Sequence, residues 1–321
     1  MGELPFHYEV ELPLAAADAL ASLRVGEFRV LANNRKLLQG FGAGLGVADL
    51  DVALRWLDKL DKIGAAGVRA GLEGDGLTAA QADAFLELAA ISTPDAVELA
   101  SRARAVADAA GTGGPLFEEG LGQLAALLRG AAGRRPGAVV ADLRIARGLD
   151  YYTGTVYETA WLGHEALGSV CSGGRYDSLA SDGGRAYPGV GLSIGVTRLV
   201  SRIIAEGLLA PSRLSPAAVL VAVADEADRD AAAAVAALFR SRGIAAEVSP
   251  TAAKFGKQIR HADRLGIPFV WFPGDGIGRL EGEVKDIRSG EQVPADAATW
   301  APPAEDLAVR VAPPGPVVDQ G

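Results

Sequence analysis

One twelve-residue segment concentrates side chains that could bind an anionic or aromatic substrate. Arg147 opens the segment, and Asp150, Tyr151 and Tyr152 follow within five residues. An arginine guanidinium is a rigid planar donor that matches a carboxylate or a phosphate. Tyrosine hydroxyls can donate or accept hydrogen bonds and can therefore recognise a polar ring. The alternative is an edge strand with a turn at Asp150, and the spacing alone does not decide between the two.

Two glycine-rich segments follow in the same region. Residues 173–177 read Gly-Gly-Arg-Tyr-Asp, where consecutive glycines allow close backbone approach to a ligand; a plain turn is the alternative. Residues 189–195 carry three glycines whose spacing is not that of a dinucleotide-binding fingerprint. They predict a strand leading into a helix with Arg198 in its first turn, where the guanidinium and the helix N-terminus could both face a phosphate. The alternative is a packing strand beside a solvated arginine.

A basic helix is expected over residues 254–265. Its spacing places four polar side chains on one face: Lys254, Lys257, Gln258 and His261. Residues 240–264 contain six Lys or Arg against two acids, a local charge of +4 in a chain of net charge −9. Such a surface suits a phosphate backbone, and a solvated helix face is the alternative.

These segments need elements to position them, and the first part of the chain predicts a sheet interrupted by helices. Alternating apolar residues predict strands at 7–12 and 27–31, and further strands near 138–145, 155–161 and 189–195. Residues 46–135 read as helical. The expected helix starts are Asp49 or Asp51, a capping box at residues 78–81, and Thr93 as an N-cap followed by Pro94.

The last third of the chain alternates strands and helices, which predicts a small α/β domain. A linker is expected at residues 210–216. The elements after it are strand 218–224, helix 226–242, strand 244–249, helix 254–265, strand 267–273 and a hairpin near 279–293. Residues 301–321 carry five prolines and are expected to form a flexible tail.

Composition excludes several classes of protein. The chain has 321 residues, 49% hydrophobic and 22% charged, which is ordinary globular composition. Cys171 is the one cysteine, so no internal disulfide framework forms, and the three scattered histidines make a zinc site unexpected. The N-terminus lacks the features of a signal peptide, and no apolar run reaches about 18 residues. A cytoplasmic protein without membrane contact is expected.

Taken together, the segments resemble the histidyl-tRNA synthetase family. Residues 147–158 are similar to its signature peptide, residues 173–177 to its next glycine motif, and residues 191–199 to motif 3 of class II synthetases. The remaining matches are residues 33–38 and 57–64, which fit the entry to a helical insertion, and residues 254–269 and 284–292, which fit a C-terminal anticodon-binding domain. The resemblance runs from residue 4 to about residue 300.

The resemblance implies an α+β fold with a defined order of domains. An antiparallel-sheet class II catalytic domain, N-terminally incomplete, is expected over residues 1–209, with a helical insertion at about 46–135. A small α/β anticodon-binding domain is expected over residues 217–300, followed by the tail at 301–321. Members of the family are homodimers, so the resemblance implies a homodimer.

The resemblance also implies the activity of a histidine–tRNA ligase. Such an enzyme uses ATP and Mg²⁺ to convert L-histidine to histidyl-adenylate, then transfers histidine to the 3′ end of tRNA(His). Arg147 would be the catalytic arginine between the histidine carboxylate and the ATP α-phosphate. Tyr151, Tyr152 and Tyr176 would line the histidine pocket, and Arg198 would bind the ATP γ-phosphate. The implied tRNA-binding residues are Lys254, Lys257, Gln258 and His261, and no protein ligand for a metal is identified.

The sequence departs from the family pattern before residue 7. Motif 1, which forms the dimer interface, and motif 2, whose arginine binds the α-phosphate, should precede this point and have no counterpart in the chain. We therefore expect a synthetase that lacks roughly its first hundred residues, with impaired activity and an exposed sheet edge that lowers stability. A non-catalytic tRNA-binding fragment and a histidine-sensing regulatory paralogue are the alternatives. Thr197 replaces the glutamate common before the motif 3 arginine, without an evident reason.

Overall fold

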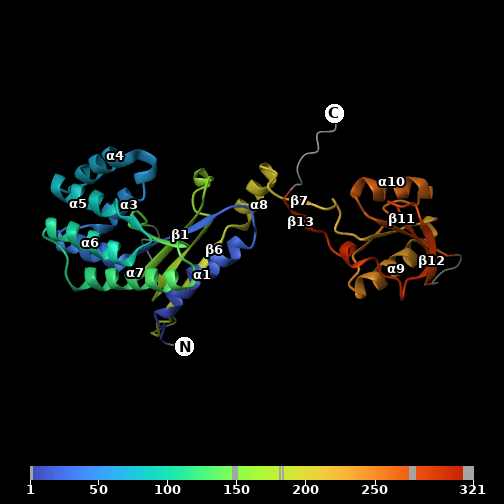
Figure 1. The fold of residues 1–321 in the computed structure, drawn as a ribbon, viewed down its shortest axis with the longest axis horizontal. Helices are drawn as coiled ribbons and strands as arrows, with labels where there is room; N and C mark the ends of the chain where they lie inside the picture. Colours follow the sequence, from blue (N-terminus) through green and yellow to red (C-terminus); the bar gives the residue numbers. More distant parts are fainter. Residues whose placement is uncertain (1–2, 147–150, 181, 183, 275–279, 314–321) are drawn as a thin grey trace. The chain divides into compact units, whose positions relative to one another are not determined.

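The computed structural model describes residues 3–146, 151–180, 182, 184–274 and 280–313 (Figure 1). The chain divides into two units, Met1–Arg202 and Ile203–Gly321. Each is described by itself. Both combine helices with a mixed sheet, so the predicted α+β fold is confirmed.

A six-stranded sheet forms the centre of the first unit. In spatial order its strands are β2 (Ser92–Thr93), β3 (Val139–Asp142), β1 (Phe28–Asn34), β4 (Thr155–Trp161), β5 (Cys171–Tyr176) and β6 (Gly189–Ile194). Only β1 and β3 pair in parallel; the other described pairs are antiparallel. β6 lies at one edge of this sheet.

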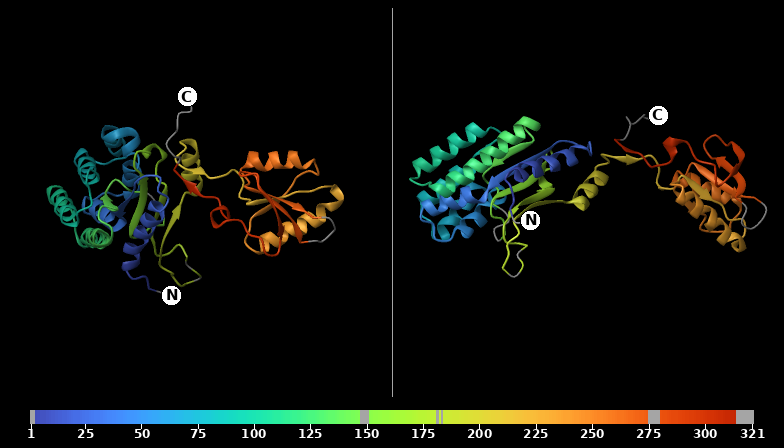
Figure 2. Two further views of the ribbon diagram at one scale, coloured as in Figure 1. Left: turned by 45° about the vertical axis from the view of Figure 1, so that its right-hand side comes forward. Right: turned by 90° about the horizontal axis from the view of Figure 1, so that it is seen from below.

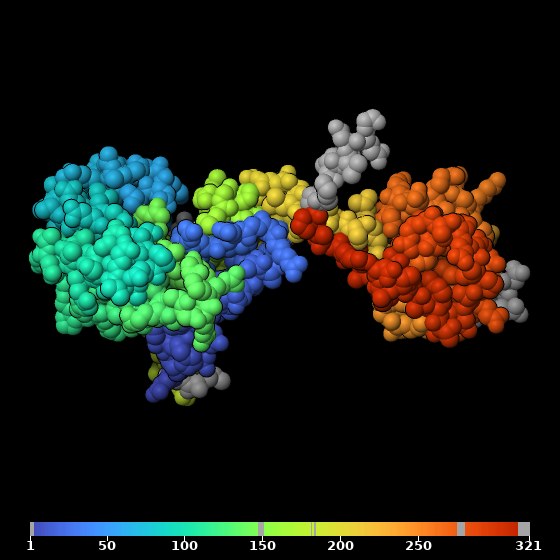
Figure 3. All heavy atoms as spheres, viewed as in Figure 1, coloured from blue at the N-terminus to red at the C-terminus, as the bar shows by residue number. Residues whose placement is uncertain are grey.

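Helices between β1 and β3 form a block at one end of the first unit, seen as the blue-green atoms in Figure 3. They are α2 (Arg35–Gly44), α3 (Leu50–Leu57), α4 (Leu60–Gly74), α5 (Ala79–Ala89), α6 (Ala96–Ala109) and α7 (Pro115–Arg134). The side chain of Asp49 caps α3, and Thr78 with Gln81 forms the predicted capping box of α5. Phe41 contacts both Phe85 and Phe117, which joins the block into one apolar core.

One predicted helix start is displaced by two residues. Thr93 was expected to cap the helix, with Pro94 at the first helical position. Thr93 instead belongs to β2, and the side chain of Asp95 accepts hydrogen bonds from the backbone of Val97 and Glu98. The Asp95 carboxylate satisfies two of the orphan N–H groups of α6 and therefore outcompetes the threonine hydroxyl.

The prediction of a strand at residues 7–12 is wrong, because these residues open α1 (His7–Ala21). The buried positions of α1 follow helical spacing: Glu9, Pro13, Ala16 and Leu20. A six-residue window holds too few apolar positions to separate a helix from a strand. Together with α7, α1 packs against the sheet (Figure 2).

The second unit contains a five-stranded sheet between two helices. Its strands, in spatial order, are β12 (Gln292–Asp296), β11 (Glu281–Asp286), β10 (Phe269–Pro273), β8 (Val219–Val221) and β9 (Ala246–Val248). Side chains alternate along β8 and β10, so one face packs on α9 (Arg229–Ser241) and the other on α10 (Phe255–Leu265). Figure 2 shows these two helices on opposite faces of the sheet.

Short elements complete the chain. They are α8 (Val196–Ala205), the 3-10 turns Glu165–Leu167, Glu226–Asp228 and Ala304–Asp306, β7 (Ala210–Pro211) and β13 (Val311–Ala312). β7 and β13 pair antiparallel, so the expected linker and part of the expected flexible tail form a two-stranded ribbon. Proline does not prevent this pairing, because a two-stranded ribbon consists only of edge strands.

Candidate active site

Three tyrosines gather at one end of β5 and β6. The rings of Tyr151 and Tyr152 lie 4.3 Å apart, and Tyr152 is half-buried against Gly174 of β5. Burial, followed by the hydrogen bond with Tyr151, raises the pKa of Tyr152 above its ordinary value, so its hydroxyl stays protonated at neutral pH. Tyr176 ends β5, and its ring lies over Gly189 of β6. The structure thus brings together the three tyrosines predicted for one pocket.

The floor beside these rings is made of small residues. The antiparallel register pairs Ser172 with Ser193 and Gly174 with Gly191, and all four lie on the sheet face that carries Tyr176. A Cβ atom on Gly189 would lie 2.6 Å from the ring of Tyr176, whereas one on Gly191 would keep an ordinary 3.6 Å contact. Gly189 is therefore required for the observed position of the ring.

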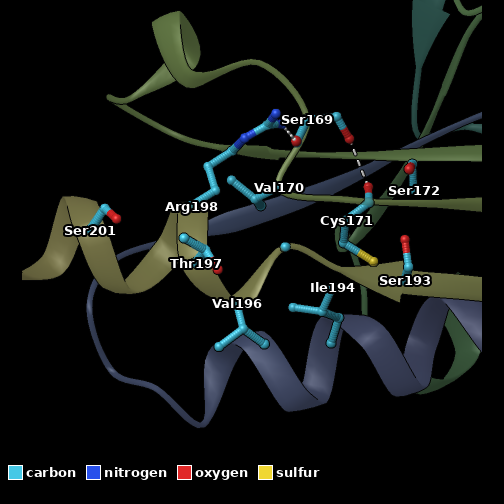
Figure 4. Close-up of a pocket in the computed structure, with 11 residues that line it drawn as sticks. Ser169, Val170, Cys171, Ser172, Ser193, Ile194, Val196, Thr197, Arg198 and Ser201 are labelled. Atoms are coloured by element: carbon cyan, nitrogen blue, oxygen red, sulfur yellow. Dashed lines mark hydrogen bonds between the residues drawn. The ribbon is translucent and has the colours of Figure 1, made fainter.

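A pocket of about 790 Å³ lies at the opposite end of β5 and β6 (Figure 4). Its walls come from the start of β5, the end of β6 and the first turns of α8, and its lining includes Ser172, Ser193, Thr197, Arg198 and Ser201. Arg198 is exposed and donates a hydrogen bond to the backbone carbonyl of Ser169. Arg198 lies in the first turn of α8, as the sequence predicts, and a guanidinium and a helix N-terminus both favour an anion.

The pocket and the tyrosines are separated by a distance that a small substrate can span. Ser172 and Tyr176 are four residues apart on β5, which corresponds to about 13 Å at the usual rise of a strand. Arg147 lies outside the described residues.

Sequence reasoning missed a buried carboxylate behind the tyrosines. Glu9 of α1 has no exposed surface, and its carboxylate accepts hydrogen bonds from Arg175 at 2.8 Å and from the Thr155 hydroxyl at 2.6 Å. The guanidinium of Arg175 also binds Asp177 at 3.0 Å. A local sequence pattern cannot indicate that two residues 166 positions apart form an ion pair. The one available sign was an arginine, Arg175, directly after two glycines in a predicted site segment.

The predicted basic face of α10 is only partly present. Lys254 and Lys257 are exposed, and His261 is half-buried beside Glu247 at 3.5 Å. Gln258 is a correction: it is buried, and its amide group bonds to the backbone of Val223 on both sides. A side chain at i+4 from Lys254 lies some 40° around the helix, enough here to turn it toward the sheet, so Gln258 does not belong to an exposed RNA-binding face.

A second pocket, of about 680 Å³, lies on the second unit. Phe255 and Ile259 of α10 and Phe272 of β10 form its apolar part, and Glu281 and Glu283 lie at its polar side. The rings of Phe255 and Phe272 are 4.9 Å apart in an edge-to-face arrangement. Phe255 is 40% exposed, so an aromatic surface is available for stacking.

The described residues contain neither a candidate membrane span nor a candidate metal-binding cluster. No helix among them has the length and apolar character needed to cross a membrane. Within the same part of the chain, no three His, Cys, Asp or Glu side chains cluster in a way that could hold a metal ion.

Comparisons with known proteins agree on one family. Residues 3–199 match the family model described as histidyl-tRNA synthetase, and residues 217–298 match one described as an anticodon binding domain. The histidine–tRNA ligase of Bifidobacterium longum is 54% identical over 316 residues, covering 94% of this chain and 68% of that protein. The corresponding protein of Micrococcus luteus is 52% identical over 313 residues, covering 97% of this chain and 67% of the relative.

A solved structure extends this similarity to the fold. The crystal structure of histidyl-tRNA synthetase from Nostoc sp. PCC 7120 matches with a TM-score of 0.72 and 33% identity. The match covers 92% of this chain and 70% of that one, so the chain spans about two thirds of its relatives' length. On these matches the chain belongs to the histidyl-tRNA synthetase family of aminoacyl-tRNA synthetases.

Proposed function

We propose that the chain has the function of a histidine–tRNA ligase. It would bind L-histidine at its tyrosines and the ATP phosphates at Arg198. In the first step a carboxylate oxygen of histidine attacks the α-phosphorus of ATP, and histidyl-adenylate forms as pyrophosphate leaves. In the second, a hydroxyl of the terminal ribose of tRNA(His) attacks the histidyl carbonyl carbon and displaces AMP. The observation that carries this proposal is the small-residue floor that joins the tyrosine cluster to the Arg198 pocket.

The residues of the pocket fit the triphosphate of ATP. Arg198, the N-terminus of α8 and the hydroxyls of Ser172 and Ser193 are donors for phosphate oxygens. Mg²⁺ usually keeps waters and substrate phosphates as ligands, so it would enter with the nucleotide rather than through a cluster of carboxylates. When bound, it would neutralise charge on the phosphates. Arg147 would stabilise the charge that develops between the carboxylate and the α-phosphate.

We assign the parts of the chain accordingly. Residues 1–209 would form the catalytic domain with its helical insertion at about 46–135, and residues 217–300 would bind the anticodon. The match of residues 217–298 to an anticodon binding domain supports the second assignment. Lys254, Lys257 and His261 would contact the tRNA backbone, and the half-exposed Phe255 offers a stacking surface for a base.

Activation of histidine by the isolated chain is proposed to be impaired. The sequence contains no arginine in a motif 2 context, and the α-phosphate would lose one of its cations. A non-catalytic tRNA-binding role is therefore the second candidate. The intact tyrosine cluster favours a retained histidine pocket, which a purely RNA-binding fragment does not need.

The test is histidine-dependent ATP–pyrophosphate exchange by the 321-residue chain, with tRNA binding measured in parallel. Exchange that disappears in an Arg147→Ala variant would show that the chain is a competent enzyme and that impairment is wrong. No exchange, with histidine and tRNA both bound, would support a recognition part without chemistry. Exchange that persists in the variant would indicate a contaminating synthetase, and absence of both binding activities would overturn the proposed function.

Lys257→Gln is expected to weaken tRNA binding most at low salt. A lysine that neutralises one phosphate contributes about one unit to the slope of log K against log salt concentration, so the slope should fall by about that amount. Lys254→Gln should act similarly. Affinity measured by filter binding between 50 and 300 mM salt would reveal the change (~one unit of slope).

Arg240→Gln provides the charge-matched control for this prediction. Arg240 lies on α9, across the sheet from α10, and bonds to the backbone carbonyl of Ala246. An unchanged slope in Lys257→Gln, or an equal reduction in Arg240→Gln, would mean that the α10 face does not contact the RNA.

A further inference from the structure

The buried carboxylate of Glu9 has no part in the chemistry proposed above. Its two oxygens are both bonded: one accepts from Arg175, and the other from the hydroxyl and, at 3.3 Å, the backbone N–H of Thr155. A charge without exposed surface is retained only where its partners compensate its lost hydration. Glu9 is thus a carboxylate whose burial costs hydration free energy, and it lies on the sheet face opposite to the candidate histidine pocket.

Glu9 is fixed in place by a gap in its own helix. Pro13 has no N–H, so the carbonyl of Glu9, four residues earlier, has no helical donor. The hydroxyl of Tyr157 on β4 donates to this carbonyl at 2.6 Å. Burial, and then the charge of Glu9, raise the pKa of Tyr157 well above its ordinary value, which keeps this donor protonated. Both the main chain and the side chain of Glu9 are therefore tied to β4.

Arg175 carries the connection to the tyrosines. It lies between Gly174 and Tyr176 on β5, so its side chain leaves the sheet on the face opposite to the ring of Tyr176, toward α1. Asp177, which Arg175 also binds, accepts a hydrogen bond from the Thr153 hydroxyl at 2.7 Å. The backbone N–H of Thr153 in turn donates to the carbonyl of Arg175 at 2.9 Å.

This network fixes the residues next to two of the pocket tyrosines. Thr153 follows Tyr152, and Arg175 and Asp177 flank Tyr176. We propose that Glu9 and Arg175 are positioning residues that hold Tyr152 and Tyr176 in their histidine-binding places from the opposite face of the sheet. The proposal rests on the proposed function for its ligand, but its geometric part concerns the tyrosines alone.

The first measurement compares the affinities of the full chain for histidine and for ATP, by calorimetry. Glu9→Gln and Arg175→Met are each expected to weaken histidine binding roughly fivefold. The double variant should lose no more affinity than the single variant with the larger loss, because both residues act through one network. ATP affinity, set at the Arg198 end of the floor, should change less than about twofold. Equal losses for both ligands would indicate general destabilisation and overturn the proposal.

The second measurement observes the tyrosines without any ligand. The chain contains six tyrosines, which 3-fluorotyrosine labels for ¹⁹F NMR, and Tyr→Phe variants assign the resonances. In Glu9→Gln the resonances of Tyr152 and Tyr176 should shift or broaden, while that of Tyr187 stays in place. Asp142→Asn is the matched control, since Asp142 is also a buried carboxylate paired with an arginine, Arg144, on a strand at the other side of the sheet.

The two measurements separate the two ideas. If the unaltered chain binds no histidine but the tyrosine resonances move in Glu9→Gln and not in Asp142→Asn, the proposed function fails and the positioning role stands. If the resonances of Tyr152 and Tyr176 do not move, or move equally in Asp142→Asn, the positioning role is wrong, whatever the chain binds.

Discussion

Replacing Arg198 by alanine is expected to weaken ATP binding by about 10- to 150-fold, the equivalent of one charged hydrogen-bonding group lost from a phosphate site. Arg198 reaches into the pocket from the first turn of α8, where the helix N-terminus already favours an anion. Its guanidinium is exposed and makes one backbone contact, so its removal should cost the fold little. Equilibrium binding of a labelled ATP analogue would give the ratio.

Arg202→Ala is the matched control for this variant. Arg202 lies one turn further along α8, outside the lining of the pocket, and donates to the imidazole of His164. Its loss removes the same charge without removing the proposed phosphate contact. ATP binding that falls equally in both variants would reduce the effect to long-range electrostatics and would remove Arg198 from the proposed site.

Gly189→Ala is expected to weaken histidine binding by about tenfold, because one added carbon in a fitted pocket has an effect of this order. The new Cβ atom would lie 2.6 Å from the ring of Tyr176, so the ring must move away from its present place. The backbone at Gly189 needs no positive φ, and β6 is an edge strand, so the fold can accept alanine. Calorimetric titration with histidine measures the change.

Gly191→Ala tests whether the effect comes from Tyr176. It makes the same substitution on the same strand, but its Cβ atom would lie 3.6 Å from the ring, an ordinary contact. Histidine affinity should therefore change much less than in Gly189→Ala. Similar losses in both variants would show that β6 tolerates no side chain here, and that the position of Tyr176 is not the cause.

Local signals in the sequence predicted much of this architecture. The capping box of α5 and the strands β4 and β10 were predictable, because each depends on residues within one short segment. The gathering of three tyrosines was predictable only through the resemblance to a family, since the turn signals in residues 147–177 do not say which strands pair. The roles of the candidate site residues remain predictions.

What the sequence could not give were pairings between distant elements. Glu9 and Arg175 meet only because α1 packs across β5, and the alternating pattern that predicts a strand at residues 7–12 gives no sign of this contact. The prediction that Gln258 lies on an exposed face was wrong for the same reason. The sequence indicates its position on the helical wheel, but not that its amide bonds to the backbone of Val223. Periodicity describes one element at a time, and burial is decided by the neighbour.

The proline in α1 has a consequence for how the first unit comes apart. Since Pro13 leaves the carbonyl of Glu9 dependent on a hydroxyl from β4, α1 on its own has an incomplete hydrogen-bond ladder and a charge without its partner. Its helical state is then conditional on the strand, and the two should open and close as one cooperative unit in amide exchange. The hydrogen bonding of α1 is therefore completed by Tyr157, a residue almost half the chain length away.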